Sequence, residues 1–496
     1  MSLGKLYGVG LGPGDPELMT VKAARLISEA QVIAYHCARH GRSIARSVAE
    51  PYLREGQLEE KLVYPVTTET TDHPGGYEGA IADFYELSAK RLAEHLDAGR
   101  DVVLLCEGDP FFYGSYMYMH ERLSGRFEAI VVPGVTSVSA ASSVLGRPLV
   151  QRDEVLTVLP GTLPAPELAR RLADTDAAAV LKLGRTFGSV REAFEEAGKL
   201  DDAVYVERAT WGQQRIEPLA SVDPASVPYF SLALLPSPAY ASRQSPAPAP
   251  VPAGGSGEVV VVGLGPAGPE WLTPEAASEL DAAEHVVGYG PYVARVPQKA
   301  GQQRHASGNR VEADRAREAL ALASGGARVA VVSSGDPGVF AMASAVLEQV
   351  AGGHGPGVRV RVVPGVTAAQ AAASRVGAPL GHDYCVLSLS DRLKPWEIIE
   401  KRLDAAGAAD LVLALYNPAS RSRTTQLASA RDVLLRHRAP ETPVVVARDV
   451  GGPEEDIRIT TLGDLDPSTV DMRCLLIVGS SKTRAENGIV WTPRSY

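Results

Sequence analysis

The chain has 496 residues, of which 45% are hydrophobic and 22% charged, and its net charge is −10. This length allows two or more domains with cores of their own, and the composition is typical of a globular protein. The negative charge, with no basic stripe, argues against non-specific nucleic-acid binding, and the lack of an apolar run of about 18 residues argues against a membrane span.

The chain opens on a predicted strand without a basic and apolar leader, which argues against export. Its cysteines are scattered and form no CxxC pair: Cys37, Cys106, Cys385 and Cys474. Such usage suits a reducing compartment, so we expect a cytoplasmic protein.

A glycine-rich stretch occurs twice along the chain. Residues 9–20 read VGLGPGDPELMT and residues 262–273 read VGLGPAGPEWLT. Each copy follows a short apolar run and precedes an Ala-rich helical pattern, which predicts a strand, a tight loop and a helix. Self-similarity of this kind indicates internal duplication.

A dinucleotide-binding loop is the first alternative, because the glycines of the second copy have the fingerprint spacing. Three observations argue against it. Pro266 and Pro269 lack the N–H groups that a pyrophosphate needs, and the first copy breaks the spacing. Neither following strand (31–35 and 285–289) ends on an acid that could hold a ribose.

Strands alternate with helical patterns in both halves, which predicts an α/β fold. The first half has strands at 6–9, 31–35 and 102–106, one ending at 132, a helix at 138–144, and strands at 155–159, 178–183 and 203–207. The second half has strands at 259–262, 285–289 and 329–333, one ending at 363, a helix at 369–376, and strands at 385–389, 411–415 and 444–447. We expect two α/β lobes per half, with a cleft between them.

A Pro/Ala/Ser/Gly segment at 236–257 cannot build a core and predicts an extended linker. The expected domains are therefore residues 1–235 and 258–496, joined by this linker.

Two further turns recur in both halves, each at a strand end. Gly-Asp-Pro stands at 108–110 and 335–337, and Pro-Gly-Val-Thr at 133–136 and 364–367. In open α/β sheets, ligands bind outside the carboxyl ends of the strands. The Asp could receive a ligand ammonium or a ribose hydroxyl, or only cap a helix; its recurrence favours the ligand site.

The ordered set GLGPGDPE, GDPFFYGS and PGVTS, repeated as GLGPAGPE, GDPGVF and PGVTA, resembles the tetrapyrrole (corrin/porphyrin) methylases. That resemblance implies a tandem duplication of their two-lobed α/β fold, a class III methyltransferase, with S-adenosyl-L-methionine as methyl donor in each half. LVYPVTTETTDHPGGYEG resembles the precorrin-2 C20-methyltransferase subgroup, and SGNRVEADRAREAL and LYNPASRSR resemble the precorrin-3B C17-methyltransferase subgroup. The resemblance implies a fused bifunctional enzyme of cobalamin biosynthesis, whose second half also contracts the ring.

The resemblance implies a set of cofactor contacts for each half. In the first half the matched positions are Pro13, Gly108, Asp109, Pro110, Tyr113, Thr136, Ser137, Leu183 and Ala209. In the second half they are Pro266, Gly335, Asp336, Pro337, Phe340, Thr367, Ala368, Tyr416 and Asn417.

Methyl transfer from a sulfonium to an electron-rich carbon needs alignment and water exclusion and no protein nucleophile. Ring contraction does need proton transfer, for which His305, Asp391 and Tyr416 are the candidates. Because precorrins carry many carboxylates, we expect pocket arginines. Candidate substrate residues are His73 and Tyr77, from a segment that is about 26 residues longer in the first half, with Arg185, Arg208, Arg215, Arg421, Arg423 and Arg448.

No metal is expected, because His36 and His40 have zinc-ligand spacing but no third ligand nearby. The expected partners are precorrins, with no nucleic acid and no membrane, in a homodimer or an internal pseudo-dimer. Another pair of tetrapyrrole methylases, a dinucleotide-dependent oxidoreductase and a non-catalytic tetrapyrrole carrier remain as alternatives.

Overall fold

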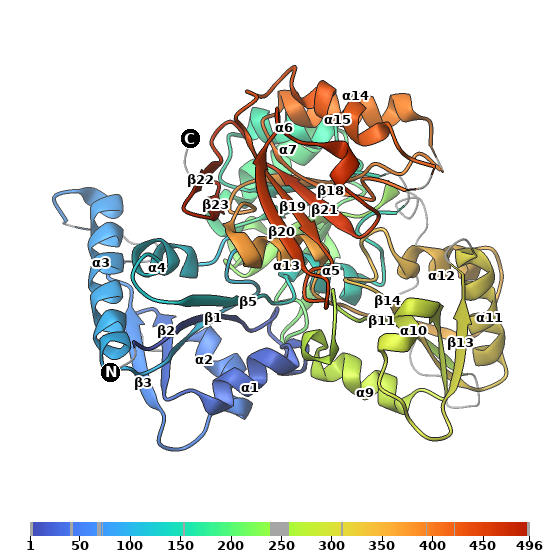
Figure 1. Cartoon of the computed structure of the whole chain (residues 1–496), viewed down its shortest axis with the longest axis horizontal. Coiled ribbons are helices and arrows are strands. Elements are labelled where there is room, and N and C mark those ends of the chain that lie inside the picture. The colour runs from blue at the N-terminus through green and yellow to red at the C-terminus, as the bar shows by residue number, and fades with distance from the viewer. Residues whose placement is uncertain are drawn as a thin grey trace. The chain divides into compact units, whose positions relative to one another are not determined.

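The computed structural model describes residues 3–39, 43–66, 71, 73–151, 154–238, 257–308, 311–392, 394–420 and 422–493. The chain forms two compact units, Met1–Thr136 and Ser137–Tyr496 (Figure 1). Most of the predicted linker lies outside the described residues, so the predicted domain boundaries stay a prediction.

The first unit contains a five-stranded sheet with the order β3-β2-β4-β1-β5, in which every pairing is parallel. Its strands are β1 (Leu6–Gly10), β2 (Val32–Cys37), β3 (Leu58–Val63), β4 (Val102–Cys106) and β5 (Ala129–Val132). Its helices are α1 (Val21–Glu29), α2 (Ile44–Ala49), α3 (Gly76–Asp97) and α4 (Tyr116–Leu123). Strand β4 is buried throughout, as its continuous apolar run predicts for a strand covered on both faces.

The second half of the chain, which lies in the second unit, begins with a sheet of the same design. Its strand order is β13-β12-β14-β11-β15, and its pairings are again parallel. Its strands are β11 (Glu258–Gly263), β12 (His285–Tyr289), β13 (Gln303–Ser307), β14 (Arg328–Ser333) and β15 (Arg359–Val363). Its helices are α9 (Pro274–Ala282), α10 (Gly290–Arg295), α11 (Glu312–Ser324) and α12 (Met342–Ala351). The equal strand order confirms the internal duplication.

Helix α3 has 22 residues whereas its counterpart α11 has 13. Part of the extra length of the first half therefore lengthens this helix, and does not form only a loop.

The second unit also contains a ten-stranded sheet to which both halves of the chain contribute. The first half supplies β6 (Leu156–Pro160), β7 (Ala177–Leu181), β8 (Val204–Glu207), β9 (Arg215–Pro218) and β10 (Ser231–Leu235). The second supplies β17 (Tyr384–Ser388), β18 (Val412–Tyr416), β19 (Pro443–Arg448), β20 (Asp456–Thr461) and β21 (Cys474–Val478). Its order, β20-β19-β21-β18-β17-β6-β7-β10-β8-β9, is a palindrome of equivalent strands centred on the antiparallel β17–β6 pair. Such an order has the symmetry of an isologous dimer interface.

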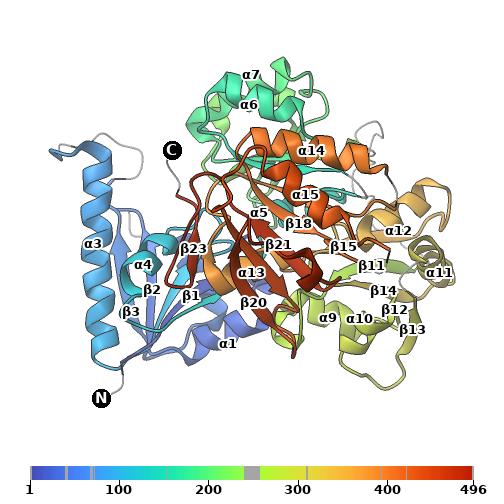
Figure 2. The ribbon, with the colours of Figure 1, turned by 45° about the horizontal axis from the view of Figure 1, so that its top comes forward.

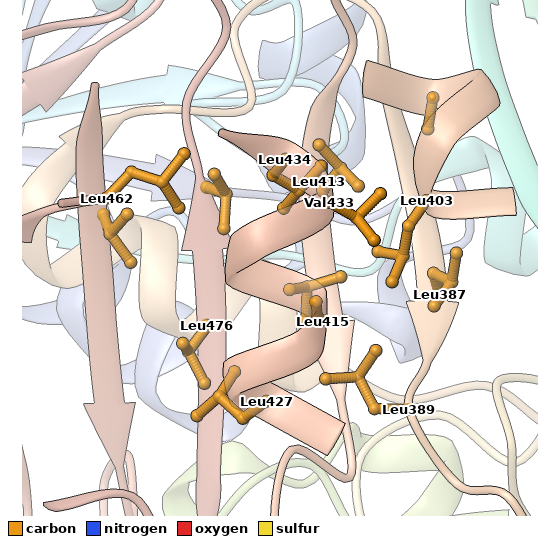
Figure 3. Close-up of a cluster of buried hydrophobic side chains, with 14 of the residues drawn as sticks. Leu387, Leu389, Leu403, Leu413, Leu415, Leu427, Val433, Leu434, Leu462 and Leu476 are labelled. Atoms are coloured by element: carbon orange, nitrogen blue, oxygen red, sulfur yellow. The ribbon is translucent and has the colours of Figure 1, made fainter. Parts of the chain in front are cut away.

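One face of this sheet is covered by α6 (Ala165–Ala173), α7 (Phe187–Glu196), α14 (Trp396–Ala408) and α15 (Gln426–Leu434), which Figure 2 shows gathered together. The register places Cys385 beside Thr157 and Thr157 beside Ala178, so the cores under the two helix pairs lie on the same face. Figure 3 shows the second-half core, where leucines of β17 and β18 pack against α14 and α15.

The opposite face carries α13 (Ala368–Val376), since Gln370 of that helix donates to the Tyr384 hydroxyl at 3.3 Å. Side chains also join the halves: Arg171 pairs with Asp383, and Arg402 with Asp176 at 2.9 Å. A small sheet of β16 (Gly377–Ala378), β22 (Arg484–Glu486) and β23 (Ile489–Trp491) closes the second half.

Among the described helices, none is long and apolar enough to cross a membrane. All four cysteines are buried and free.

Candidate functional site

The glycine loop and the Gly-Asp-Pro turn pair with each other at the carboxyl ends of neighbouring strands. In the second half, Gly265 and Gly335 exchange backbone hydrogen bonds, with N···O distances of 3.2 and 2.8 Å. In the first half, Gly12 and Gly108 exchange the equivalent bonds at 3.3 and 2.8 Å. The duplicated motif therefore builds the same loop pair twice, each within one unit.

Glycine is required where a third loop meets this pair. A Cβ on Gly365 would lie 2.4 Å from the Gly335 carbonyl oxygen, and a Cβ on Gly134 would lie 2.1 Å from that of Gly108. The two turn glycines have φ of 65° (Gly108) and 66° (Gly335), a conformation that favours glycine. A Cβ on Gly108 would meet no described atom within 4 Å, so a ligand can approach this backbone closely.

The Asp of each Gly-Asp-Pro turn is buried and joins two loops. One carboxylate oxygen of Asp336 accepts from Gly338 N at 2.8 Å and the other from Gly365 N at 3.2 Å. Asp109 makes the same bonds with Phe111 N at 2.9 Å and Gly134 N at 3.1 Å. Burial raises the pKa of Asp109 to about 7 and that of Asp336 to about 6. Each carboxylate thus holds two loops together. The sequence analysis considered a ligand contact or a helix cap for these residues, and did not consider this role.

Left-handed residues that are not glycine follow the strands at equivalent positions. Tyr113 (φ 56°) and Phe340 (φ 50°) follow the Gly-Asp-Pro turns, and Lys182 (φ 59°) and Asn417 (φ 52°) follow β7 and β18. Such strained residues cluster at functional sites. Their recurrence in both halves supports a ligand site along this edge.

The register of paired strands shows which residues of the two halves are equivalent where the motifs do not. Leu181 pairs with Pro160 as Tyr416 pairs with Ser388, so Leu181 occupies the position of Tyr416. Arg208 and Asp449 are both left-handed after equivalent strands, which makes Val450, buried at 7% exposure, the counterpart of Ala209. Motif matching alone missed Val450, because no motif marks the end of β19.

The predicted second-half contacts meet at the start of α13. Thr367 caps this helix by accepting from Gln370 N at 3.2 Å, and Ala368 is its first residue. The Tyr416 hydroxyl accepts from Ala369 N at 3.2 Å, and its ring lies 5.5 Å from that of Phe340. Burial raises the pKa of Tyr416 to about 12, so its hydroxyl stays protonated near neutral pH. Pro337 contacts the glycine loop, since its Cδ would lie 2.9 Å from a Cβ on Gly263.

Sequence reasoning missed Arg295, which organises the second-half glycine loop. Its guanidinium donates to the carbonyls of Leu264 (3.2 Å) and Gly265 (2.8 Å), to that of Ala267, and to the Ser334 hydroxyl at 3.1 Å. Burial lowers its pKa. No pattern in the sequence marks this role, because α10 follows the glycine loop by about 30 residues and contacts it only in the folded chain.

Two of the proton-transfer candidates lie at the ends of β17 and β18, and the third does not. Asp391 accepts from Gln426 at 2.7 Å, and buried Arg423 lies 3.6 Å from it. Arg423 also donates to the Asn417 carbonyl at 3.1 Å, which links this group to the residue after Tyr416. His305 instead lies mid-strand in β13, where its ring contacts His285 and Glu318.

The other candidate arginines differ in their surroundings. Arg208 and Arg215 both pair with buried Glu207 at the end of β8, and Arg185 is exposed. Arg448 pairs with Asp471 at 2.9 Å and Glu454 at 3.1 Å, which leaves it in a surface ion-pair cluster. Arg421 lies outside the described residues.

The first-half set is divided between the units. Pro13, the 108–110 turn, Tyr113 and Thr136 belong to Met1–Thr136, while Ser137, Leu183 and Ala209 belong to Ser137–Tyr496. Leu183 and Ala209 are buried.

Among the candidate substrate residues from the longer segment, His73 lies 3.0 Å from Asp83 and Tyr77 is exposed. The ring of His36 stacks on that of Tyr64 at 5.3 Å, and burial lowers its pKa to about 4; His40 is outside the described residues.

Comparison with known proteins gives a family and close relatives. The family model described as Tetrapyrrole (Corrin/Porphyrin) Methylases matches residues 5–223 and again 258–466. The cobalamin biosynthesis protein CobIJ of Mycobacterium bovis is 60% identical over 501 residues, covering 99% of this chain and 96% of the relative. A precorrin-2 C(20)-methyltransferase of Sinorhizobium sp. is 51% identical over 237 residues, covering 48% of this chain and 96% of the relative. A precorrin-3B C(17)-methyltransferase of the same source is 46% identical over 243 residues, with the same two shares.

Proposed function

Because the chain belongs to the tetrapyrrole (corrin/porphyrin) methylase family, we propose that it is a bifunctional S-adenosylmethionine-dependent methyltransferase of corrin ring biosynthesis. The first half methylates C20 of precorrin-2, and the second methylates C17 of precorrin-3B with ring contraction. The similarity of the whole chain to CobIJ, and of its halves to the two single methyltransferases, supports this assignment. The observation that carries it is the paired glycine loop and Gly-Asp-Pro turn, built twice.

The residues present fit a methyl donor in each half. A Cβ on Gly108 would meet no described atom within 4 Å, and one on Gly335 would meet none closer than 3.8 Å, so both turns leave their backbone open to a close approach. Within Met1–Thr136, the residues that would contact one molecule are Pro13, Gly108, Asp109, Pro110, Tyr113 and Thr136. Pro266, Gly335, Asp336, Pro337, Phe340, Thr367, Ala368, Tyr416 and Asn417 would hold the second.

The bound sulfonium supplies an electrophilic methyl group with a neutral leaving group, so the chain itself has little covalent chemistry to perform. The chain's contribution is to align donor and macrocycle and to keep water out. Asp336 fixes the two loops that form the floor of the second-half site, and Tyr416 fixes the start of α13 beside them. Residues with left-handed backbone conformations at the strand ends, such as Phe340 and Asn417, fix the path of the chain around these loops.

Substrate carboxylates need cationic partners at the same edge. Arg423 is the best placed in the second half, because it is buried and bonded to the residue after Tyr416. In the first half, Arg208 and Arg215 both pair with Glu207 at the end of β8 and would bind the substrate carboxylates. For ring contraction we propose that Asp391 takes part in proton transfer, since it lies beside Arg423, whereas His305 contacts other groups.

The palindromic ten-stranded sheet supports an internal pseudo-dimer within each chain. The direct experiment supplies the purified chain with S-adenosylmethionine labelled in its methyl group and, in separate reactions, with precorrin-2 or with precorrin-3B. We expect label at C20 in the first reaction, and label at C17 with a contracted ring in the second. No label in the macrocycle would contradict the proposal, and label at other carbons would indicate another pair of tetrapyrrole methylases.

A further inference from the structure

The first half of the chain contributes a side chain to the second-half loop pair. Ser139, on helix α5 (Ser137–Leu145), is 3% exposed, and its side chain hydrogen-bonds the carboxylate of Asp336. Asp336 already accepts two backbone N–H groups, from Gly338 and Gly365. The hydroxyl is therefore a third hydrogen bond to the buried carboxylate, and it comes from the other half.

Other contacts keep α5 at this place. Ser143 donates to the Val362 carbonyl of β15 at 2.5 Å, and Val150 N donates to the Gly338 carbonyl at 3.4 Å. A Cβ on Gly338 would lie 3.2 Å from the Ser142 hydroxyl, so a side chain at this position would crowd the helix. The first half therefore contacts this turn at Asp336 and at Gly338.

The equivalent helix of the second half differs at the positions of Ser139 and Ser142, whereas Ser143 corresponds to Ser374. Counting from the Pro-Gly-Val-Thr motif, Ser139 corresponds to Gln370, which donates to Tyr384 of its own half. Serine is a poorer helix former than alanine, which stands at 373 in place of Ser142. The serines of α5 therefore cost helix stability, and two of their hydroxyls are used in bonds to the second half.

We propose that Ser139 is a positioning residue of the second-half methyl-donor site, so that C17 methylation depends on a side chain from the C20-methylating half. Ser139 acts through Asp336: its hydroxyl holds the carboxylate ionised and oriented toward Gly338 and Gly365. When the carboxylate is protonated, the oxygen that carries the proton accepts a weaker hydrogen bond from its N–H group, so the loops that hold the cofactor are tied together less strongly. Tyr416 is a titratable group that interacts with Asp336, and it is neutral in this range.

The test uses the full chain, with S-adenosylhomocysteine as calorimetric probe from pH 5 to 8. In Ser139→Ala we expect affinity at one of two sites to fall about tenfold near neutral pH, because a hydrogen bond to a charged group is lost. The acid limb of that site's binding should also move to higher pH, while the other site and C20 methylation stay unchanged. Ser139→Thr, which keeps the hydroxyl, should restore most of the affinity.

Two matched serines serve as controls. Ser374→Ala removes a hydroxyl that bonds within α13, to the Ala371 carbonyl at 2.7 Å. Ser143→Ala removes a bond between the halves that does not involve Asp336. Neither should move the pH profile, so a shift in Ser143→Ala equal to that in Ser139→Ala would reduce Ser139 to a packing contact and overturn the proposal.

The inference rests on the proposed function, and the two fail differently. Should the unaltered chain bind no probe, the proposed function fails. Should it bind two molecules while Ser139→Ala binds both unchanged at every pH, only the role of Ser139 fails.

Discussion

The hydroxyl of Tyr416 accepts a hydrogen bond from the backbone N–H of Ala369 at 3.2 Å. This bond joins the carboxyl end of β18 to the first turn of α13, whose early N–H groups have no partner within the helix. A side chain thereby fixes the distance between two of the loops proposed to hold the methyl donor.

Replacement of Tyr416 by Phe should weaken the second site selectively. The ring still packs on Phe340, but the Ala369 N–H loses its acceptor, at a cost of about 1–2 kcal/mol. We expect C17 methylation to slow by about tenfold while C20 methylation is unchanged, as measured by product analysis with labelled donor. Tyr229→Phe, at a position 62% exposed, is the control. Equal loss of both activities would argue that Tyr416 serves the fold and not one site.

Addition of one methyl group at Gly365 should abolish the second site. The Cβ of Gly365→Ala would lie 2.4 Å from the backbone carbonyl oxygen of Gly335, so the Pro-Gly-Val-Thr loop and the Gly-Asp-Pro turn must separate. We expect one probe molecule bound per chain in place of two. Gly188→Ala on α7, where a Cβ meets no described atom within 4 Å, should bind as the unaltered chain does. Normal binding by Gly365→Ala would show that close approach of these loops is not needed.

The buried carboxylates predict how stability depends on pH. Burial raises the pKa of Asp336 to about 6, above the value of about 3.9 in an unfolded chain, so the native state binds its proton more tightly. Stability contributed by this group is therefore full below about pH 4 and is lost as pH rises to about 6, by on the order of 2–3 kcal/mol.

The comparison that isolates this effect is with Asp336→Asn, whose side chain does not titrate. The melting temperature of the unaltered chain, relative to that of the variant, should fall between pH 4.5 and 7. Asp109→Asn should show the same trend continuing to about pH 7, because the pKa of Asp109 is raised to about 7. A relative stability that rises with pH would mean that the hydrogen bonds outweigh burial.

Replacement of Arg295 tests whether its hydrogen bonds hold the second-half glycine loop, which contains Pro266. Arg295→Lys keeps the charge but loses the planar set of donors shared among three carbonyls and Ser334, and should cost about 1–3 kcal/mol. We expect second-site affinity to fall by at least tenfold in calorimetry. Arg359→Lys changes an exposed arginine that pairs with Glu258 at 3.5 Å and should have little effect. If both variants bind alike, the hydrogen bonds of Arg295 are not needed to hold the loop.

Much of the fold followed from the sequence, because its signals are local. Strand β4 was predicted at its exact bounds, and the repeated glycine stretches predicted equal sheets in each half. The helix at 138–144 was found as α5 because its small residues have helical spacing without Gly or Pro.

What could not be predicted depends on distant contacts. Nothing local marks the pairing of Cys385 with Thr157, so the sheet shared by the halves was missed. The roles of Asp336, Arg295 and Ser139 were missed for the same reason, since their partners are backbone groups or side chains far along the chain.

The most direct test of two separate methyl-donor sites is a calorimetric titration of the purified chain with S-adenosylhomocysteine. We predict two molecules bound per chain, and one in each of Asp109→Ala and Asp336→Ala, because each substitution releases the loops of one half. Binding of a single molecule to the unaltered chain, or loss of both sites from one substitution in a folded protein, would contradict the account.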